Sequence, residues 1–526
     1  MKKKVSILLS TVCAVSCCFS AACGGAKEVD GGEQELQIYV LEQGYGRDWM
    51  LETIDAFKQQ DWVKEKYPNL KIDTPTFNDQ VGYATNQMSL GEKYNYFDLL
   101  MGASTLKGYY GSKDALDLTD LVYNQQLPNE KITYKEKLNT SLTAMFATDK
   151  NGEERYYATP YFSGQYGILY NTTELAKYTS ETPRTTDELL AVCKKIKDAG
   201  KTAFMWGADA DYFEKEGGIL EVWWAQYNGL EGYDNFWKGI DNDARSNAIF
   251  TQKGRLYSLQ VLETILTKRN GYFDQGFTGN NFMVAQQKFM MGESVFHYNG
   301  DYFVDEMKDT LKDMESANIS YSEVDMMRTP IISKITETFE NPEEWTDEKL
   351  SAVIKAIDNG ATSYDGVSEY DFAKICEARG IVGSVGPAPA IIPAYAKAKD
   401  VAVDFLRFMG TDIGIAAYAK GTGGSTIDFK CNLKEVDEAL YNDLSLLHKD
   451  RLDFINASNL TVTLLRKGST YPLHEFGAVR IFANEAWDEA FISGSGITAQ
   501  KIYDDTIAKW DGDTFDAAVA KAGLNG

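Results

Sequence analysis

The chain has 526 residues, more than a single hydrophobic core normally serves, so we expect two lobes or domains. Its 77 Asp and Glu residues outnumber its 53 Lys and Arg residues, and the formal net charge of −24 disfavours nucleic acid and anionic lipid as partners. Aromatic residues make up 13% of the chain, which leaves rings available after a core is filled.

The N-terminus has the pattern of an export signal. The basic residues Lys2–Lys4 precede an apolar stretch, Val5–Phe19, and the small residues Ser20–Ala22 lead to Cys23. This order predicts a secretory signal peptide over residues 1–22. The apolar stretch is shorter than the ~20 residues that a membrane-spanning helix needs.

Cys23 stands where bacterial lipoproteins carry their lipid. The segment Ala21–Gly25 resembles their lipobox, although Ser20 occupies the position where that motif usually has Leu. The resemblance implies that Cys23 carries a diacylglyceryl group and that the exported protein is anchored to the outer face of the cell membrane. Two acyl chains are enough for stable anchoring. Residues 23–34, rich in Gly and charge, are expected to form a flexible tether.

Strand and helix patterns alternate after the tether. The short apolar runs that predict strands are Leu36–Leu41, Leu70–Thr74 and Phe97–Met101. Between the first two, apolar residues at helical spacing, including Met50, Ile54 and Phe57, predict a helix over Trp49–Tyr67. This order of elements predicts βαβ units and a largely parallel sheet.

A second strand–helix unit begins at the apolar run Gly167–Tyr170. Thr185 and Glu188 have the spacing of a capping box, which predicts a helix start, and Gly200 is expected to end that helix. The apolar face of the predicted helix consists of Leu189, Leu190, Cys193 and Ile196.

Residue types that carry common catalytic chemistry are scarce. The histidines are His297, His448 and His474, without metal-ligand spacing, and no G-x-S-x-G motif occurs. The cysteines after Cys23 are Cys193, Cys376 and Cys431, an odd number that argues against a disulfide framework. We therefore expect no catalytic residue, no metal and no cofactor. A surface glycosidase or lyase stays open as an alternative, because two carboxylates suffice for glycoside hydrolysis.

Several segments follow one another in an order known from one family. They are Lys66–Ile72, Phe97–Leu99, Leu116–Leu121, Tyr157–Pro160, Gly167–Asn171, Thr182–Leu189, Phe289–Ser294, Asn299–Tyr302 and Ala402–Phe408. Taken together they resemble the extracellular solute-binding proteins of bacterial carbohydrate ABC importers, the maltose-binding-protein-like class. The resemblance extends over most of the chain.

The resemblance implies an α/β, two-lobed, periplasmic-binding-protein-like fold of class II type, with a cleft between the lobes and a hinge of crossover strands. On this pattern residues 35–158 and 299–386 form lobe one, and residues 159–298 and 387–526 form lobe two. The chain is longer than typical members, with insertions around 318–380 and 432–471 that can reshape the cleft.

Candidate ligand contacts follow from what a sugar needs. Flat rings bind its C–H faces, polar side chains bind its hydroxyls, and ligands in open α/β sheets lie beyond the carboxyl ends of strands. The candidates after the first and third strands are Glu42, Gln43, Tyr45 and Ser104; those at the crossovers are Tyr161, Asn299, Asp301 and Tyr302; those in an aromatic-rich segment are Trp206, Trp223, Trp224, Tyr227 and Trp237. By family resemblance Asp301 is the strongest polar candidate. The rings equally fit a lobe core, and the adjacent Trp223 and Trp224 cannot both face the same side.

Together these features predict the lipid-anchored binding component of an ABC importer, which captures a carbohydrate and delivers it to permease subunits in the membrane without acting as an enzyme. We expect a monomer that closes around an oligosaccharide rather than a monosaccharide. The same fold binding a polyamine, a peptide or a metal chelate stays open as an alternative. A polyamine would use acidic residues among the rings, namely Asp209, Asp211 and Glu221.

Overall fold

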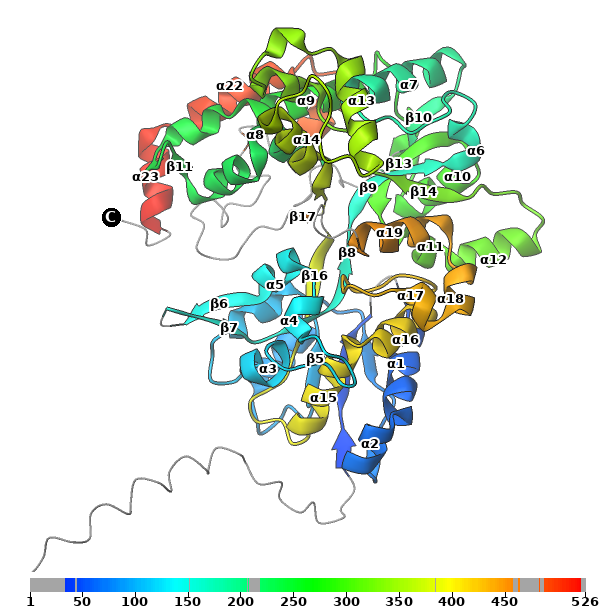
Figure 1. Ribbon diagram of the computed structural model, residues 1–526, viewed down its shortest axis with the longest axis vertical. Helices are drawn as coiled ribbons and strands as arrows, with labels where there is room; N and C mark the ends of the chain where they lie inside the picture. The colour runs from blue at the N-terminus through cyan, green and yellow to red at the C-terminus, as the bar shows by residue number, and fades with distance from the viewer. Residues whose placement is uncertain are drawn as a thin grey trace, which may run out of the picture.

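The computed structural model describes residues 34–42, 45–150, 152–205, 207, 218–383, 385–456, 462–463, 482 and 487–521. It has two α/β lobes, one above the other in Figure 1. The first lobe, at the bottom, is built from residues 34–164 and 385–443, and the second lobe, at the top, from residues 166–382 and 487–521. Helix α19 (Leu446–Asn456) lies between the two lobes.

The first lobe contains a mixed sheet covered by helices. The strands of this lobe are β1 (Gln34–Leu36), β2 (Ile38–Leu41), β3 (Leu70–Ile72), β4 (Thr76–Asn78), β5 (Leu99–Met101), β6 (Ala147–Lys150), β7 (Glu153–Tyr156), β8 (Thr159–Gly164) and β16 (Val385–Ile391). Strands β1 and β3, and strands β6 and β7, form separate two-stranded sheets. The helices of this lobe are α1 (Asp48–Gln59), α2 (Asp61–Lys66), α3 (Tyr83–Leu90), η1 (Ser104–Tyr109), η2 (Thr119–Tyr123), α4 (Tyr134–Lys137), α5 (Thr140–Phe146), α15 (Lys399–Met409), α16 (Asp412–Thr422), α17 (Leu433–Val436) and α18 (Glu438–Asp443).

The second lobe has a smaller sheet and more helices. Its strands are β9 (Tyr166–Asn171), β10 (Thr202–Met205), β11 (Ile240–Asp241), β12 (Ala244–Arg245), β13 (Ser294–Gly300), β14 (Val324–Met327) and β15 (Ile381–Val382), which pairs with β17 (Val462–Thr463). Its helices are α6 (Thr172–Leu175), α7 (Thr186–Asp198), α8 (Ile219–Lys238), η3 (Asn247–Thr251), α9 (Lys253–Leu266), η4 (Phe277–Gly279), α10 (Phe282–Met290), α11 (Phe303–Glu306), α12 (Lys308–Ser316), η5 (Ser333–Thr338), η6 (Pro342–Glu344), α13 (Asp347–Asp358), α14 (Glu369–Gly380), α21 (Trp487–Ser493), α22 (Ala499–Lys509) and α23 (Gly512–Lys521).

Both sheets mix parallel and antiparallel neighbours. Among the described residues the first-lobe sheet has the order β4-β2-β5-β16-β8, in which β2 is parallel to β4 and β5. Strand β16 is antiparallel to β5 and β8. The second-lobe sheet has the order β10-β13-β9-β14, and β9 is antiparallel to both neighbours. The predicted parallel βαβ arrangement is therefore correct for the start of the chain, whereas the crossover strands β9 and β16 run the other way.

Local sequence signals explain where several elements begin and end. Thr185 caps α7, because its hydroxyl accepts the Glu188 N–H at 3.1 Å, and Glu188 in turn accepts the Arg184 N–H at 2.7 Å. The expected helix over residues 49–67 is two helices, α1 and α2. Gln60 separates them, because its extended ψ of 132° interrupts the helical path.

The structure divides the chain between the lobes differently from the prediction. Residues 299–386 do not return to the first lobe, because β13 lies between β9 and β10 in the second-lobe sheet, and α13 and α14 pack into the second-lobe core. The return occurs later, at β15 and β16. Helix α15 then packs on the first lobe, where Phe405 and Phe408 lie 5.3 and 5.4 Å from the ring of Phe57.

The two ends of the described chain lie in opposite lobes. Strand β1 pairs with β3 in the first lobe, whereas Phe515 of α23 belongs to the core of the second. None of the described helices is both long and apolar enough to cross a membrane.

Candidate functional site

A polar pocket of about 500 Å³ lies where the chain passes between the lobes. The start of β9, strand β14, the end of α14 and helix α19 line it. Helix α19 belongs to both lobes: Leu447 packs in a second-lobe cluster with Leu169, and Leu452 packs in the first-lobe core. One wall of the pocket is therefore a segment that joins the lobes.

Arg451 of α19 connects the lobes through buried ion pairs. Its guanidinium contacts Asp301, which follows β13, and Asp428, which follows α16, at 2.6 Å. Its Nη1 also donates to the carbonyl and hydroxyl oxygens of Thr426, each at 2.9 Å. Burial lowers the pKa of Arg451 and the two carboxylates raise it, with a net rise, whereas burial raises the pKa of both Asp301 and Asp428. Removal of Arg451 would leave two buried carboxylates without a cation.

Two polar atoms at the pocket have no hydrogen-bond partner. They are Oδ1 of Asp301 and Nε2 of Gln165, and both residues are at most 4% exposed. The two residues are neighbours, because the Asp301 N–H donates to the Gln165 carbonyl at 2.9 Å. A buried donor or acceptor left unpaired costs about 1–3 kcal/mol, so such atoms normally mark a place where a ligand or an ordered water binds.

Three further carboxylates line another part of the pocket, near Tyr170, five residues along the chain from Gln165. Asp325 on β14 is buried and accepts the Tyr170 hydroxyl at 2.5 Å, while Asp450 and Asp453 lie on the exposed face of α19. Burial raises the pKa of Asp325; burial together with the charges of Asp325 and Asp453 raises the pKa of Asp450 to about 6. In the part of the chain that the structure describes, no Lys or Arg forms an ion pair with these three groups. This side of the pocket is therefore an uncompensated acidic surface, and we call it the acidic side.

The other cations at the pocket are already paired. Arg379 donates to both oxygens of Asp358 at 2.9 and 2.8 Å, and Arg328 donates to the same carboxylate at 3.0 Å. The Arg328 guanidinium also lies 4.7 Å from the centre of the Phe454 ring. Asp358 balances one of the two guanidinium charges, and neither guanidinium forms an ion pair with the acidic side.

Three of the predicted tyrosines lie in or against the first-lobe core and do not line the pocket. Tyr45 packs against Phe162 and Tyr302 with ring centres 4.9 and 6.4 Å apart, and Tyr161 stacks on Trp49 at 6.0 Å. The hydroxyl groups of Tyr45 and Tyr161 are buried without a partner, whereas Tyr302 is half-buried. Burial is the main cause that raises the pKa of the first two, so both hydroxyls stay protonated.

The other predicted polar residues lie outside the pocket. Glu42 follows β2 and pairs with Arg47 at 2.8 Å, and Ser104 is exposed at the start of η1. Asn299 is buried in β13, where its amide contacts the His297 ring at 3.3 Å. Of all the predicted residues described, only Asp301 lines the pocket.

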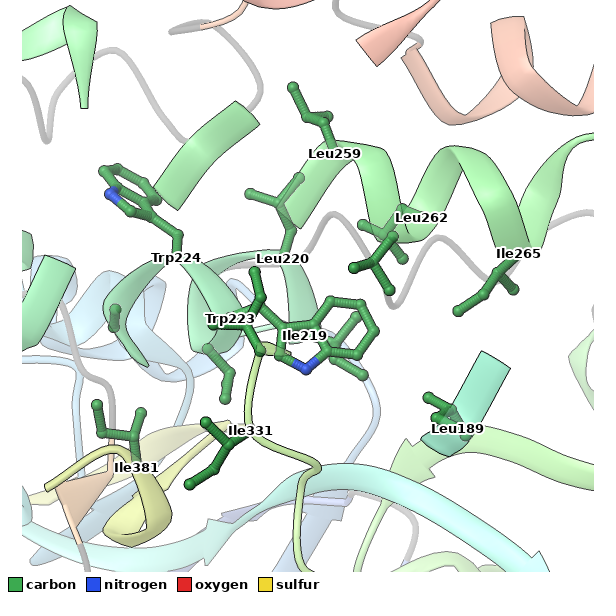
Figure 2. Close-up of a cluster of buried hydrophobic side chains, with 14 of the residues drawn as sticks. Leu189, Ile219, Leu220, Trp223, Trp224, Leu259, Leu262, Ile265, Ile331 and Ile381 are labelled. Carbon is green, nitrogen blue, oxygen red and sulfur yellow. The ribbon is translucent and has the colours of Figure 1, made fainter. Parts of the chain in front are cut away.

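The described part of the aromatic-rich segment, from residue 218 on, packs in the second-lobe core instead of facing a ligand. Figure 2 shows Trp223 and Trp224 among apolar side chains from α7, α8 and α9. Their indole N–H groups are satisfied by the Pro330 carbonyl at 3.0 Å and by Gln252 at 2.7 Å. Trp237 is equally buried and Tyr227 packs against the same core, so protein covers the ring faces that a sugar would need. We therefore no longer treat these four residues as ligand contacts.

Several predictions fall on residues outside those described. They are the signal peptide, the lipidation at Cys23 and the contacts of Gln43, Trp206, Asp209 and Asp211. The remaining member of the suggested polyamine set, Glu221, is buried in the second-lobe core, where it accepts the Tyr233 hydroxyl at 2.6 Å.

Sequence reasoning missed most of the pocket. Gln165, Asp325, Asp450 and Arg451 were not singled out, because each stands alone in the sequence without a motif. The one available signal was the insertion at 432–471, which contains α19. No three His, Cys, Asp or Glu side chains of the described ranges are grouped as a metal site requires.

The comparisons with known proteins agree with this architecture. The family model described as bacterial extracellular solute-binding protein matches residues 47–415, more than half of the chain. A protein solved in a study of xylan utilisation by Caldanaerobius polysaccharolyticus has 16% identity and a TM-score of 0.55, covering 90% of this chain and 100% of that one. A family 1 extracellular solute-binding protein from Bifidobacterium longum subsp. infantis has 16% identity and a TM-score of 0.54, covering 91% and 99%.

A chitin oligosaccharide binding protein is also similar, with 13% identity, a TM-score of 0.55 and coverage of 92% of this chain and 99% of that one. At these identities the solved structures establish the fold alone. No curated protein sequence matches the chain. Because the family model spans the segments that build both lobes, the chain belongs to the bacterial extracellular solute-binding proteins.

Proposed function

We propose that this protein is the lipid-anchored binding component of an ABC importer, and that it captures a carbohydrate between its lobes and passes it unchanged to a permease in the membrane. Family membership supports the binding role. The descriptions of two structural neighbours, which name xylan utilisation and a chitin oligosaccharide, support a carbohydrate as the ligand. The scarcity of catalytic motifs in the sequence supports release without chemistry.

The observation that carries the proposal is the pair of unpartnered atoms at the pocket. The Gln165 amide can donate and the Asp301 carboxylate can accept, and a sugar hydroxyl does both. The volume of about 500 Å³ lies within the range of roughly 300–1,000 Å³ that small-molecule sites occupy. The partly buried rings of Tyr170 and Phe454 offer apolar faces. Covering one such face contributes about 1–2 kcal/mol.

The position of α19 suggests how binding reaches the permease. A ligand held between Asp301 and α19 contacts both the second lobe and the segment that attaches to the first. Such contacts stabilise one arrangement of the lobes over the others, which is how hinged binding proteins close. The permease then recognises the closed form.

Calorimetry on the purified mature protein tests the carbohydrate claim. A panel of neutral xylo-, gluco- and galacto-oligosaccharides should include at least one ligand of about micromolar Kd, near −8 kcal/mol. Gln165→Leu should weaken that ligand about tenfold, because the amide donor is lost. The matched control is Asp443→Asn on the exposed end of α18, which should bind normally. Binding of spermidine or a peptide without any carbohydrate, or cleavage of the ligand seen by NMR, would refute the proposal.

Fractionation of cells tests the anchor. The wild-type chain should label with a radioactive fatty acid and sediment with membranes, while Cys23→Ser should do neither. A wild-type protein that is recovered only in the medium would refute lipid anchoring and leave the binding role intact.

A further inference from the structure

We propose that the pocket binds an amino sugar whose amine is not acetylated. The ammonium group lies among Asp325, Asp450 and Asp453, and the hydroxyls lie at Gln165 and Asp301. This inference rests on the proposed carbohydrate function and adds to it the chemical class of the ligand.

The first support is that the two sides of the pocket have different chemistry. At one side Gln165 and Asp301 offer one buried donor and one buried acceptor without partners, which suits a hydroxyl group. The acidic side offers only acceptors, and Asp325 already accepts the Tyr170 hydroxyl at 2.5 Å and the Met326 N–H at 2.7 Å. A ligand that spans the pocket therefore needs a polyol at one end and a donor-rich cation at the other.

The second support is the charge that the protein leaves unbalanced. Asp358 holds Arg328 and Arg379, and Asp301 with Asp428 holds Arg451. No Lys or Arg of the described residues forms an ion pair with Asp325, Asp450 or Asp453, which outnumber the one positive charge that Asp358 leaves on Arg328 and Arg379. Asp325 and Asp453 are close enough to raise the pKa of Asp450. Like charges held this closely repel each other, and a ligand cation removes the repulsion. An ammonium group has three donors, so it can bind one of these carboxylates and still donate to a neighbouring acceptor.

The titration of Asp450 gives the binding a definite pH dependence. The groups around it are Asp325 on β14, Tyr170 on β9, Arg328 after β14, and Arg451 and Asp453 on its own helix. Glu323, which precedes β14, acts on Asp325 and Tyr170. In the free protein its pKa is about 6, so the carboxyl is mostly protonated at pH 5 and mostly ionised at pH 7.5. An ammonium ligand favours the ionised form. Affinity for the amine should therefore rise between pH 5 and pH 6.5, and fall again at higher pH as the amino sugar loses its own proton.

The test compares two ligands that differ only in the amine. Calorimetry at pH 6.5, where Asp450 is mostly ionised and the amine is still protonated, uses the β-1,4-linked glucosamine disaccharide and its N-acetylated counterpart on the mature protein. The free amine should bind about tenfold more tightly, since charge-assisted hydrogen bonds are stronger than neutral ones. The double variant Asp450→Asn/Asp453→Asn should lose this preference, and the control Asp443→Asn should keep it. Lowering the pH to 5 should reduce the preference in the wild type without any mutation.

The outcomes separate this inference from the proposed function. If the N-acetylated disaccharide binds as tightly as the free amine, the ammonium site is refuted while carbohydrate binding stands. The same conclusion follows if only neutral oligosaccharides of the panel bind. If no carbohydrate binds at all, the proposed function fails and the inference fails with it.

Discussion

Two buried arginines in different regions show how a core differs from a functional site. Arg255 of α9 lies in the second-lobe core, with its guanidinium 5.2–5.7 Å from the rings of Trp224, Phe236, Phe250 and Phe482. It donates to the Phe250 carbonyl at 3.0 Å, no carboxylate of the described chain pairs with it, and burial lowers its pKa to about 9. Arg451 at the junction instead has two carboxylates, and one of them, Asp301, keeps an unpaired oxygen at the pocket.

The difference teaches that abundant rings indicate packing, whereas an unpaired atom indicates a ligand where it lines a pocket. Nε and Nη2 of Arg255 are also buried without a partner, but rings cover the guanidinium from several sides, and Arg255 lines none of the pockets described among the residues of the structure. Around Arg451 three charged groups are buried together, yet Oδ1 of Asp301 has no hydrogen-bond partner. Four variants test this contrast.

The largest effect is expected for Arg451→Met. It removes the cation between Asp301 and Asp428, which leaves two buried carboxylates unpaired, and should lower the free energy of unfolding by about 3–5 kcal/mol. Urea denaturation measures the change. Adding Asp301→Asn and Asp428→Asn to the same chain should restore part of the loss. A single variant as stable as the wild type would contradict the role of this network.

Trp224→Phe should cost less and act only on stability. The smaller ring leaves Gln252 without the indole N–H that it accepts at 2.7 Å, so we expect a loss of about 1–3 kcal/mol. Ligand affinity measured by calorimetry should not change, because Trp224 lies in the second-lobe core. Weaker ligand binding by a variant that folds normally would instead show that Trp224 contributes to the binding site.

Sequence patterns correctly predicted the features that depend on residues within a single segment. The cap at Thr185, the buried face of Met50, Ile54 and Phe57, and the crossover at Gly167–Tyr170 all follow from spacing within one segment. Which lobe a segment joins depends on distant partners. For α15 those partners lie on α1 and α2: Phe57 packs on its phenylalanines, and Lys66 pairs with Asp404 at 2.6 Å.

The pocket could not be predicted from the sequence for a related reason, because its lining residues come from distant segments of the chain. Asp301 was predicted because the family resemblance pointed to its position, whereas Arg451 reaches it from 150 residues further along the chain. An isolated Arg or Asp in a helix most often faces solvent, so the residue type alone does not predict that the side chain is buried. Aromatic density misled the prediction in the opposite direction, since a lobe of this size needs many rings for its core.

Arg255→Met should change stability by less than about 1 kcal/mol in either direction. Replacing a buried charge that has no carboxylate partner by an apolar side chain of similar length leaves nothing unpaired except the Phe250 carbonyl. Comparison with Arg451→Met in the same urea series sharpens the contrast between the two regions. Equal losses in the free energy of unfolding for Arg255→Met and Arg451→Met would contradict this contrast.

The smallest effect concerns Asp450→Asn and the pH dependence of Tm. The pKa of Asp450 is raised to about 6, so the folded state keeps a proton that the unfolded state loses near pH 4. This contribution is present below pH 4 and disappears as the pH rises through 6, so the variant should gain stability relative to the wild type over that interval. His297, whose pKa burial lowers to about 4, has the opposite trend in both proteins and cancels in the difference. A constant difference in Tm would show that Asp450 titrates normally.

The placement of β1 and α23 in opposite lobes has a mechanical consequence. The proposed lipid tether is joined to the first lobe alone. Closure therefore moves the second lobe relative to the lobe that the tether attaches to the membrane. Fluorophores attached at the two ends of the chain would thus report lobe movement as energy transfer, with no label near the pocket.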